Sequence, residues 1–202
     1  MSSIKRVMIA GAGGINSWLV QILSDLAVKG QIPPTWQFTI FDEDCVEKKN
    51  LLYQNFTFVD QMENKAKTLG DRYGMLYKSK FVKSPKDFTN FDIVICGVDN
   101  KDFRTMLFTY MNDHPEKEWI DLRSEGRVVA AFTKNSKNTL EKMMSTLSTE
   151  NDTESGSSCQ LGFELDSGII QLGNRIIANI GAQYLLNILR SEISPAKFIY
   201  RF

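Results

Sequence analysis

Three glycines near the start of the chain have the spacing of a phosphate-binding turn. The stretch IAGAGGINSW, residues 9–18, runs from an apolar, strand-like segment through Gly11, Gly13 and Gly14 into a helical pattern. Glycines let a ligand approach the backbone, and the unpaired N–H groups at the start of a helix attract anions. A tightly packed turn without a ligand is the alternative interpretation. We therefore expect a phosphate site whose ligand the downstream residues must identify.

The residues after this turn argue against a dehydrogenase. The dinucleotide fingerprint GxGxxG would place a third glycine at position 16, where this chain has Asn16. A second strand ends in the acidic group FDED, and Asp42 at its tip is suited to bind ribose hydroxyls, although a solvated charged turn is the alternative. A dehydrogenase does not account for the polar segment 50–54 or for Lys65 beyond it.

These residues lie at the ends of elements that alternate along the chain. Apolar runs predict strands at residues 6–10, 36–41, 75–82, 91–98, 119–122 and 127–133, and helical spacing predicts helices at 15–28, 61–73 and 102–111. Continuous apolar runs such as FDIVICGV are typical of parallel strands that are covered on both faces. The sequence therefore predicts an α/β fold, with a doubly wound, mostly parallel, Rossmann-like sheet and helices on both faces.

The composition disfavours several classes of protein. The chain has 202 residues, with 24 Lys and Arg against 24 Asp and Glu, so its net charge is zero. Without a basic surplus, a nucleic-acid binder that works by bulk electrostatics is disfavoured. No stretch approaches the roughly 20 apolar residues that span a bilayer, and no secretion signal precedes the first strand. We expect a cytoplasmic globular protein that binds neither nucleic acid nor a membrane.

The three cysteines predict neither a zinc site nor a disulfide framework. Cys45, Cys96 and Cys159 are widely spaced, and the chain contains no CxxC pair. Cys96 lies in an apolar run and is expected to be a buried hydrophobic residue. Cys159 ends a polar stretch and is a candidate acyl acceptor, with an incidental thiol as the alternative.

The last third of the chain changes in composition. Residues 134–158 are rich in Ser, Thr, Asn, Glu and Lys, which predicts a mobile polar loop. Apolar residues at helical spacing then predict a C-terminal helix at about residues 174–190. The length suits one core, so we expect a single domain over residues 1–202.

Four motifs, in order along the chain, resemble the ThiF/MoeB/ubiquitin-activating superfamily of adenylating enzymes. They are GAGGINS (11–17), FDEDCVEKKNLLYQ (41–54), the lysine of NKA (64–66) and VDNKDFR (98–104), and DLRSEGRVVAAF (121–132) follows them. Four ordered motifs are far more specific than the glycines alone. The resemblance implies an ATP-dependent adenylyltransferase, a nucleotidyltransferase that activates the C-terminal carboxylate of a small ubiquitin-like or sulfur-carrier protein. The product would be an acyl-adenylate, and pyrophosphate would be released.

The resemblance also implies roles for individual residues. The nucleotide-binding residues would be Gly11, Gly13, Gly14, Asp42, Asn50, Gln54 and Asn100, and the catalytic residues would be Lys65, Asp99 and Arg104. Asp99 would hold Mg²⁺ opposite the α-phosphate with Arg104 in support, and Lys65 would contact the phosphates. Such an array suits the reaction, because the attacking carboxylate and ATP are both anions. ATP and Mg²⁺ are the implied cofactors, and no structural zinc is expected.

Three departures from the family pattern leave a second function open. The family segment NLxRQ reads NLLYQ here, so Tyr53 stands where an arginine often reaches the phosphates. The chain starts at the first strand without the arginine-bearing helix of many members, and it lacks their two CxxC zinc pairs. Arg123 and Arg127 could supply the missing charge, or they could pair with Asp121 and Glu125. The alternative function is a catalytically inactive nucleotide-binding or interaction module on the same fold.

The resemblance further implies a homodimer that binds the C-terminal tail of its carrier protein. Without zinc cysteines or a separate catalytic-cysteine domain, the chain suggests a reduced bacterial or viral version of the family. Its expected location is therefore the cytoplasm of a bacterium or of the host of a virus.

Overall fold

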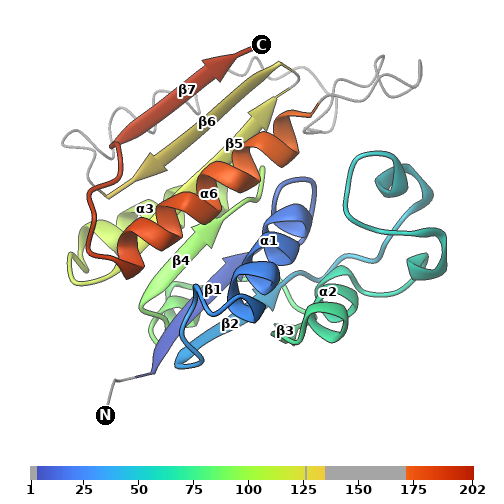
Figure 1. Ribbon diagram of the computed structural model, residues 1–202, viewed down its shortest axis with the longest axis horizontal. Helices are drawn as coiled ribbons and strands as arrows, with labels where there is room; N and C mark the ends of the chain where they lie inside the picture. Colours follow the sequence, from blue (N-terminus) through green and yellow to red (C-terminus); the bar gives the residue numbers. More distant parts are fainter. Residues whose placement is uncertain (1–3, 126, 135–171) are drawn as a thin grey trace.

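The computed structural model describes residues 4–125, 127–134 and 172–202 (Figure 1). The strands are β1 (Lys5–Ala10), β2 (Trp36–Phe41), β3 (Leu76–Lys78), β4 (Ile93–Cys96), β5 (Glu118–Glu125), β6 (Val128–Thr133) and β7 (Lys197–Arg201). The α-helices are α1 (Asn16–Val28), α2 (Lys65–Tyr73), α3 (Lys101–Asn112) and α6 (Gly173–Leu189). Short 3₁₀ helices occur at η1 (Lys48–Leu52), η2 (Phe58–Asp60) and η3 (Pro85–Phe88).

In the described part of the chain, seven strands form one sheet in the order β3-β2-β1-β4-β5-β6-β7. The five neighbouring strands β3, β2, β1, β4 and β5 are parallel to one another. Strand β6 is antiparallel to β5, and β7 is antiparallel to β6. The chain moves outward from β1 through β2 to β3 and then returns to place β4 on the other side of β1. Doubly wound sheets bind their ligands at the carboxyl ends of strands at such a reversal. The predicted fold class is confirmed.

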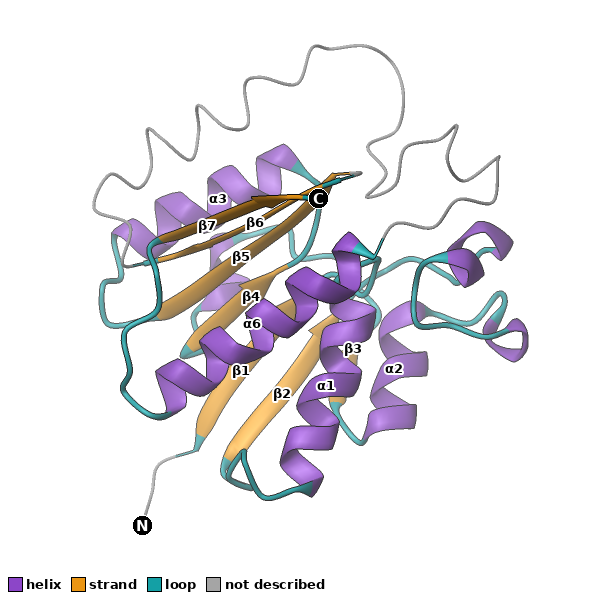
Figure 2. Cartoon of the chain, turned by 45° about the horizontal axis from the view of Figure 1, so that its top comes forward, coloured by secondary structure: helices purple, strands orange, loops and turns teal. Residues whose placement is uncertain are grey.

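Helices cover both faces of the sheet. Neighbouring residues of each strand point to opposite faces, so the apolar side chains of one strand contribute to both cores. Ile9 of β1 belongs to the core beneath α1, α2 and α6, whereas the adjacent Met8 belongs to the core beneath α3. Figure 2 shows α1 and α6 on one face, with α3 behind the strands. Strand β4 is buried at all four of its residues, as expected of a parallel strand between two helical layers.

Three elements differ from the prediction. The helix predicted at 61–73 begins only at Lys65, because the Asn64 side chain caps it by accepting a hydrogen bond from the Lys67 N–H at 2.9 Å, and Met62 has a φ of 69°. The strand predicted at 75–82 is reduced to the three exposed residues of β3. No sequence pattern predicts β7, a mostly exposed edge strand in which one side chain of five is half-buried.

Helix α6 covers Gly173–Leu189, close to the range predicted for the C-terminal helix. The predicted polar loop lies outside the described residues apart from its first residue, Lys134, and Cys159 also lies outside them. Among the helices that the structure describes, none is long and apolar enough to cross a membrane.

Candidate nucleotide-binding site

The glycine turn connects β1 to α1 and packs directly against the segment that follows β4. Gly11 has a φ of +86°, which favours glycine, and its N–H donates to the Phe41 carbonyl at 2.8 Å. A Cβ on Gly11 would lie 2.6 Å from Val98 Cγ1, and a Cβ on Gly14 would lie 2.6 Å from Asn174 Nδ2. A Cβ on Gly13, by contrast, would meet nothing within 4 Å. Gly11 and Gly14 thus allow close packing, whereas Gly13 faces open space.

Asn16 holds the turn together. Its fully buried side chain donates from Nδ2 to the carbonyls of Ala10 at 2.8 Å and Gly11 at 2.9 Å. It also fills the space beside Gly97, where a Cβ would lie 2.6 Å from the Asn16 amide. The sequence pattern identified Asn16 only as a departure from the dinucleotide fingerprint. The feature of the sequence that could have indicated this role is the residue type, because asparagine readily hydrogen-bonds to nearby backbone groups.

The turn and the end of β2 meet at Asp42. Its buried carboxylate accepts hydrogen bonds from the Ala12 N–H at 2.6 Å and the Asp44 N–H at 2.8 Å. Burial raises the pKa of Asp42, although these two N–H groups and the nearby charge of Lys65 act in the opposite direction. The structure therefore brings two predicted parts of the site into contact, the glycine turn and the acid at the end of the second strand.

Lys65 lies next to this acidic strand end. Its side chain is buried, and its Nζ forms an ion pair with the exposed Asp44 at 3.1 Å. The neighbouring Asn64 donates from Nδ2 to the carbonyls of Asp42 and Asp44, at 3.0 and 3.1 Å. These contacts hold the start of α2 against the end of β2, so a lysine distant in sequence lies at the edge that bears Asp42.

The segment between β2 and α2 carries Asn50 and Gln54 to the side of α1. Asn50 is buried, and its Oδ1 accepts a hydrogen bond from the Glu47 N–H at 2.9 Å, which caps η1. Gln54 is also buried, and its Oε1 has no hydrogen-bond partner. The segment is attached to α1 because Trp18 Nε1 donates to the Tyr53 carbonyl at 3.1 Å. Asn50 and Gln54 therefore lie on the side of α1 that carries Trp18.

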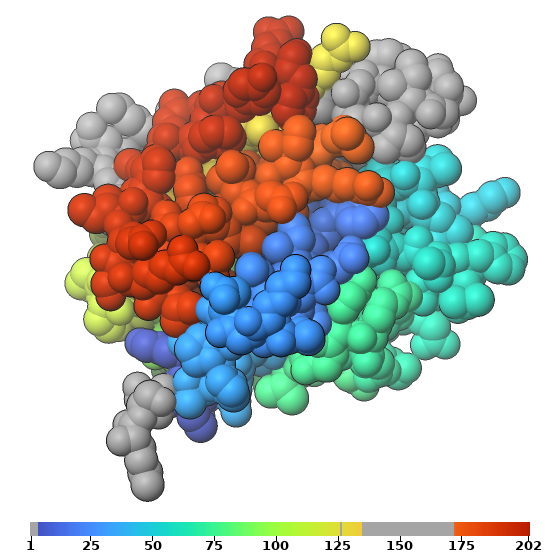
Figure 3. Space-filling model, in the orientation of Figure 1, coloured from blue at the N-terminus to red at the C-terminus, as the bar shows by residue number. Residues whose placement is uncertain are grey.

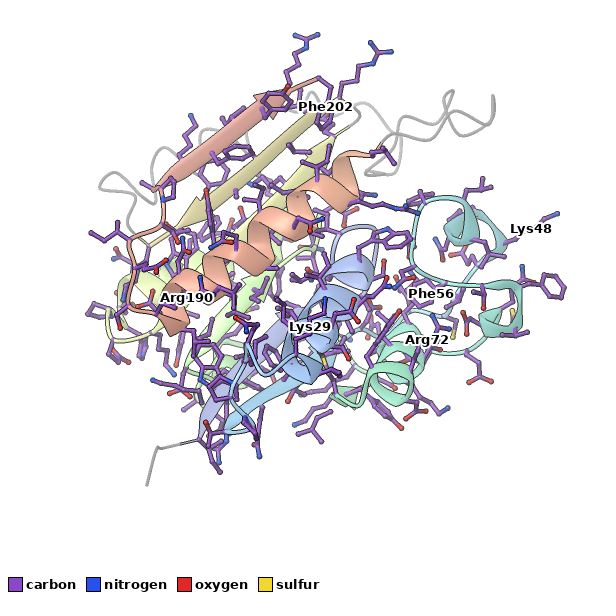
Figure 4. All side chains as sticks on the ribbon, in the orientation of Figure 1. Lys29, Lys48, Phe56, Arg72, Arg190 and Phe202 are labelled. Atoms are coloured by element: carbon purple, nitrogen blue, oxygen red, sulfur yellow. The ribbon has the colours of Figure 1, made fainter. Side chains whose placement is uncertain are left out.

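An ion pair fixes the outer part of this segment. Arg72 of α2 contacts both carboxylate oxygens of Asp60 at 2.6 Å and donates to the Asn55 carbonyl at 3.1 Å. Figure 4 shows Phe56 and Arg72 on the inner side of the segment and Lys48 at its outer margin. The segment between β2 and α2 is therefore held in place by specific contacts, although its only helices are short 3₁₀ helices.

Asp99 and Asn100 follow β4, and both are exposed. Asn100 caps α3, since its Oδ1 accepts a hydrogen bond from the Phe103 N–H at 2.8 Å. Arg104, one turn further along α3, is buried and forms an ion pair with Asp121 of β5 at 3.3 Å. Desolvation opposes its charge, but the Asp121 carboxylate outweighs that effect, so the pKa of Arg104 is raised. Arg104 thus points toward β5.

Asp121 is the centre of a buried charge cluster. It is fully buried, and its second carboxylate oxygen accepts from Arg123 Nε at 2.7 Å. Of the two interpretations of Arg123, the ion pair with Asp121 is observed, whereas Arg127 is exposed at the β5–β6 turn. Cys96 lies nearby, and burial together with the charge of Asp121 raises the pKa of its thiol to about 12. The prediction that Cys96 is buried is confirmed.

Asp99 fits a magnesium ion shared with a nucleotide. Among the residues that the structure describes, no group of three or more His, Cys, Asp or Glu side chains could hold a metal. Mg²⁺ in nucleotide sites, however, takes one or two carboxylates and completes its shell with phosphate oxygens and water. An exposed carboxylate at the end of β4, beside the glycine turn, meets this requirement.

A family model described as the ThiF family matches residues 2–202. The chain belongs to the ThiF family. The resemblance seen in the sequence motifs is thereby confirmed at the level of the family. A comparison with curated proteins gives no match.

Solved structures of similar fold include MccB and PaaA. A crystal structure of E. coli MccB with succinimide aligns with a TM-score of 0.68 at 14% identity, over 98% of this chain and 60% of that one. PaaA aligns with a TM-score of 0.67 at 16% identity, over 98% of this chain and 61% of that one. A crystal structure of E. coli MccB with ATP aligns with a TM-score of 0.66 at 13% identity, over 98% of this chain and 60% of that one. The ThiF-family chain therefore spans about three fifths of the length of these structures.

Proposed function

We propose that this chain is an ATP-dependent adenylyltransferase that activates a C-terminal carboxylate. The observation that supports this best is the convergence of three features at the carboxyl edge of adjacent strands. They are the glycine turn after β1, Asp42 after β2 and Asp99 after β4. The turn donates to Asp42 and packs against Val98, the residue before Asp99. In a ThiF-family chain, this arrangement suits a nucleotide with its ribose at Asp42 and its phosphates over the turn.

The chain's own residues would bind and orient the nucleotide. The N–H groups at the start of α1 would bind the phosphates, which can approach closely because Gly13 leaves open space. Asp42 would accept hydrogen bonds from the ribose hydroxyls, and Asn50 and Gln54 would flank the nucleotide on the side of Tyr53. Lys65 would offset phosphate charge from the end of β2.

The second part of the site would act on the α-phosphate. Asp99 would hold Mg²⁺, which when bound neutralises phosphate charge during the displacement. Asn100 and Arg104 would position Asp99, because Asn100 caps the helix that follows it and Arg104 anchors that helix to Asp121. A substrate carboxylate oxygen would form a bond to the α-phosphorus, the bond to the β-phosphate oxygen would break, and pyrophosphate would leave.

The substrate we propose is the C-terminal tail of a peptide or small protein, of the ubiquitin-like or sulfur-carrier kind. Support comes from the family and from MccB, which is described as a microcin C7 biosynthetic enzyme and has been solved with MccA. A homodimer is part of the same proposal. Cys159 stays a candidate acyl acceptor that lies outside the described residues.

Thermal unfolding with different nucleotides tests the proposal. ATP with Mg²⁺ at about 100 times its Kd should stabilise the chain by about 2.7 kcal/mol and raise the unfolding midpoint by roughly 5–10 °C. We expect a smaller rise with ATP and EDTA and a smaller rise in Asp99→Asn. A rise with NAD⁺ in place of ATP would contradict the proposal.

Pyrophosphate exchange then separates the enzyme from an inactive nucleotide-binding module. The probe is a library of peptides with free C-termini, and the same peptides with amidated C-termini are the control. Exchange that requires the free carboxylate supports adenylation. Nucleotide binding without exchange for any peptide or carrier protein would favour the inactive module.

A further inference from the structure

Helix α6 begins beside the glycine turn, so two helices start at the same edge of the sheet. The Asn174 amide lies 2.6 Å from the position of a Cβ on Gly14, at the start of α1. Figure 3 shows α6, in orange, packed against α1, in blue. No side chain caps the start of α6, and its first turn contains no acidic residue. The N–H groups and the positive end of this 17-residue helix are therefore suited to an anion.

A buried amide without a partner lies at this helix start. Asn174 is only 1% exposed, and neither its Nδ2 nor its Oδ1 forms a hydrogen bond. Leaving buried polar atoms unpaired costs free energy, so such a group usually serves a ligand or holds strain. Its position against Gly14 directs the amide toward the turn where the phosphates would bind.

The next residue supplies a positive charge. Arg175 is exposed, and its guanidinium stacks on the Trp18 ring, with Cζ 3.8 Å from the ring centroid. The same Trp18 ring donates to the carbonyl of Tyr53, the residue that replaces the arginine of many relatives. Stacking on one face leaves the N–H edge of a guanidinium able to bind phosphate. Arg175 therefore approaches the Tyr53 side of the turn from a different element.

We propose that Asn174 and Arg175 bind the polyphosphate tail of the nucleotide and that Arg175 supplies the charge lacking at Tyr53. This inference rests on the proposed function, because it needs a nucleoside triphosphate at the glycine turn. Arg123 is a poorer source of that charge, since it is bonded to the buried Asp121. Arg127, which is exposed at the β5–β6 turn, offers a matched control.

Calorimetric titration of the full chain with ATP and with AMP, both with Mg²⁺, tests this assignment. Arg175→Gln should weaken ATP binding by about tenfold, equal to about 1.4 kcal/mol, and should change AMP binding by less than about twofold. Arg175→Lys should recover part of the loss, because it restores the charge without the planar fork. Arg127→Gln should bind both nucleotides as the wild type does.

Asn174→Leu gives an independent readout, because it removes the unpaired amide at nearly constant size. We expect this variant to unfold at a higher temperature than the wild type without nucleotide, and yet to bind ATP more weakly. A lower unfolding temperature with unchanged ATP binding would show that the amide has only a structural role.

The outcomes for Arg175→Gln separate the two proposals. If the ratio of ATP to AMP affinity falls by less than about fivefold, the role of Arg175 is overturned while the proposed function stands. An equal loss of ATP and AMP binding overturns it too, because the effect would not concern the phosphate tail. If the wild type binds neither nucleotide, the proposed function itself fails.

Discussion

Asp42 and Asp121 are both buried acids of the same sheet, but they are held in different ways. Asp42, at the end of β2, accepts hydrogen bonds from two backbone N–H groups, at 2.6 and 2.8 Å. Asp121, within β5, lies between the guanidinium groups of Arg104 and Arg123, at 3.3 and 2.7 Å. One acid is balanced by backbone dipoles and the other by two full charges.

Under the proposed function, this difference separates a nucleotide-binding acid from a structural one. The ion pair of Arg104 with Asp121 ties α3 to β5, and Arg123 of the same strand binds the other oxygen of that carboxylate. Two N–H groups compensate Asp42 only in part, since burial still raises its pKa. Its oxygens keep lone pairs for further donors, which under the proposed function are the ribose hydroxyls. A buried acid is therefore better judged by its partners than by its burial.

The largest effect should follow from Asp121→Asn. This change removes the charge that compensates the buried Arg104 guanidinium and should lower the free energy of unfolding by about 3–5 kcal/mol. The matched variant Asp42→Asn should cost less, about 1–2 kcal/mol, because it also removes a charge that burial disfavours. Denaturation in urea measures both values. Equal losses would show that the two acids are held in equivalent ways.

The glycine turn that donates to Asp42 allows a second test. Gly11→Ala should destabilise the chain by about 1–3 kcal/mol, because φ is +86° and the new Cβ would lie 2.6 Å from Val98 Cγ1. Gly13→Ala should change stability by less than about 0.5 kcal/mol, since its Cβ would meet nothing. Under the proposed function, however, it should weaken ATP binding by about tenfold or more. Unchanged ATP binding in Gly13→Ala would mean that the phosphates do not approach this residue.

A third acid, Asp60, combines the two modes of compensation, because its carboxylate binds both a backbone N–H, that of Thr57, and a guanidinium, that of Arg72. Burial opposes its charge, but hydrogen bonds from Arg72 and Thr57 lower its pKa below the ordinary 3.8. Its stabilisation should therefore be fully present above pH 3.8 and be lost as pH falls through the lower, folded-state pKa. We expect Asp60→Asn to cost about 1–2 kcal/mol at pH 7 and progressively less below pH 3.8.

Urea denaturation of the wild type and Asp60→Asn from pH 3 to pH 7 measures this difference. The control is Asp71→Asn, whose exposed carboxylate pairs with Lys67 on the surface of α2 and should have little effect at any pH. A stability difference for Asp60→Asn that does not vary with pH would contradict the role of the ion pair.

Much of the fold could be predicted from the sequence, because apolar periodicity and the glycine turn are local signals. The runs at residues 6–10 and 91–98 have the composition of buried parallel strands, and the structure contains β1 and β4 there. The start of α2 and strand β7 were harder to predict. Asn64 caps the helix by accepting from the Lys67 N–H, and its side chain is held in place by a hydrogen bond to the end of β2. Strand β7 is an edge strand with little buried surface.

For the site, the residue types suited to nucleotide chemistry and their order along the chain could be identified from the sequence. Which of these residues share an edge of the sheet, and which partners they have, depends on the folded arrangement. Arg104 of α3 pairs with Asp121 of β5, and Arg175 of α6 stacks on Trp18 of α1, although the members of each pair lie far apart in the sequence. Motifs record local backbone geometry, whereas ion pairs and stacking depend on which strands and helices the topology brings together.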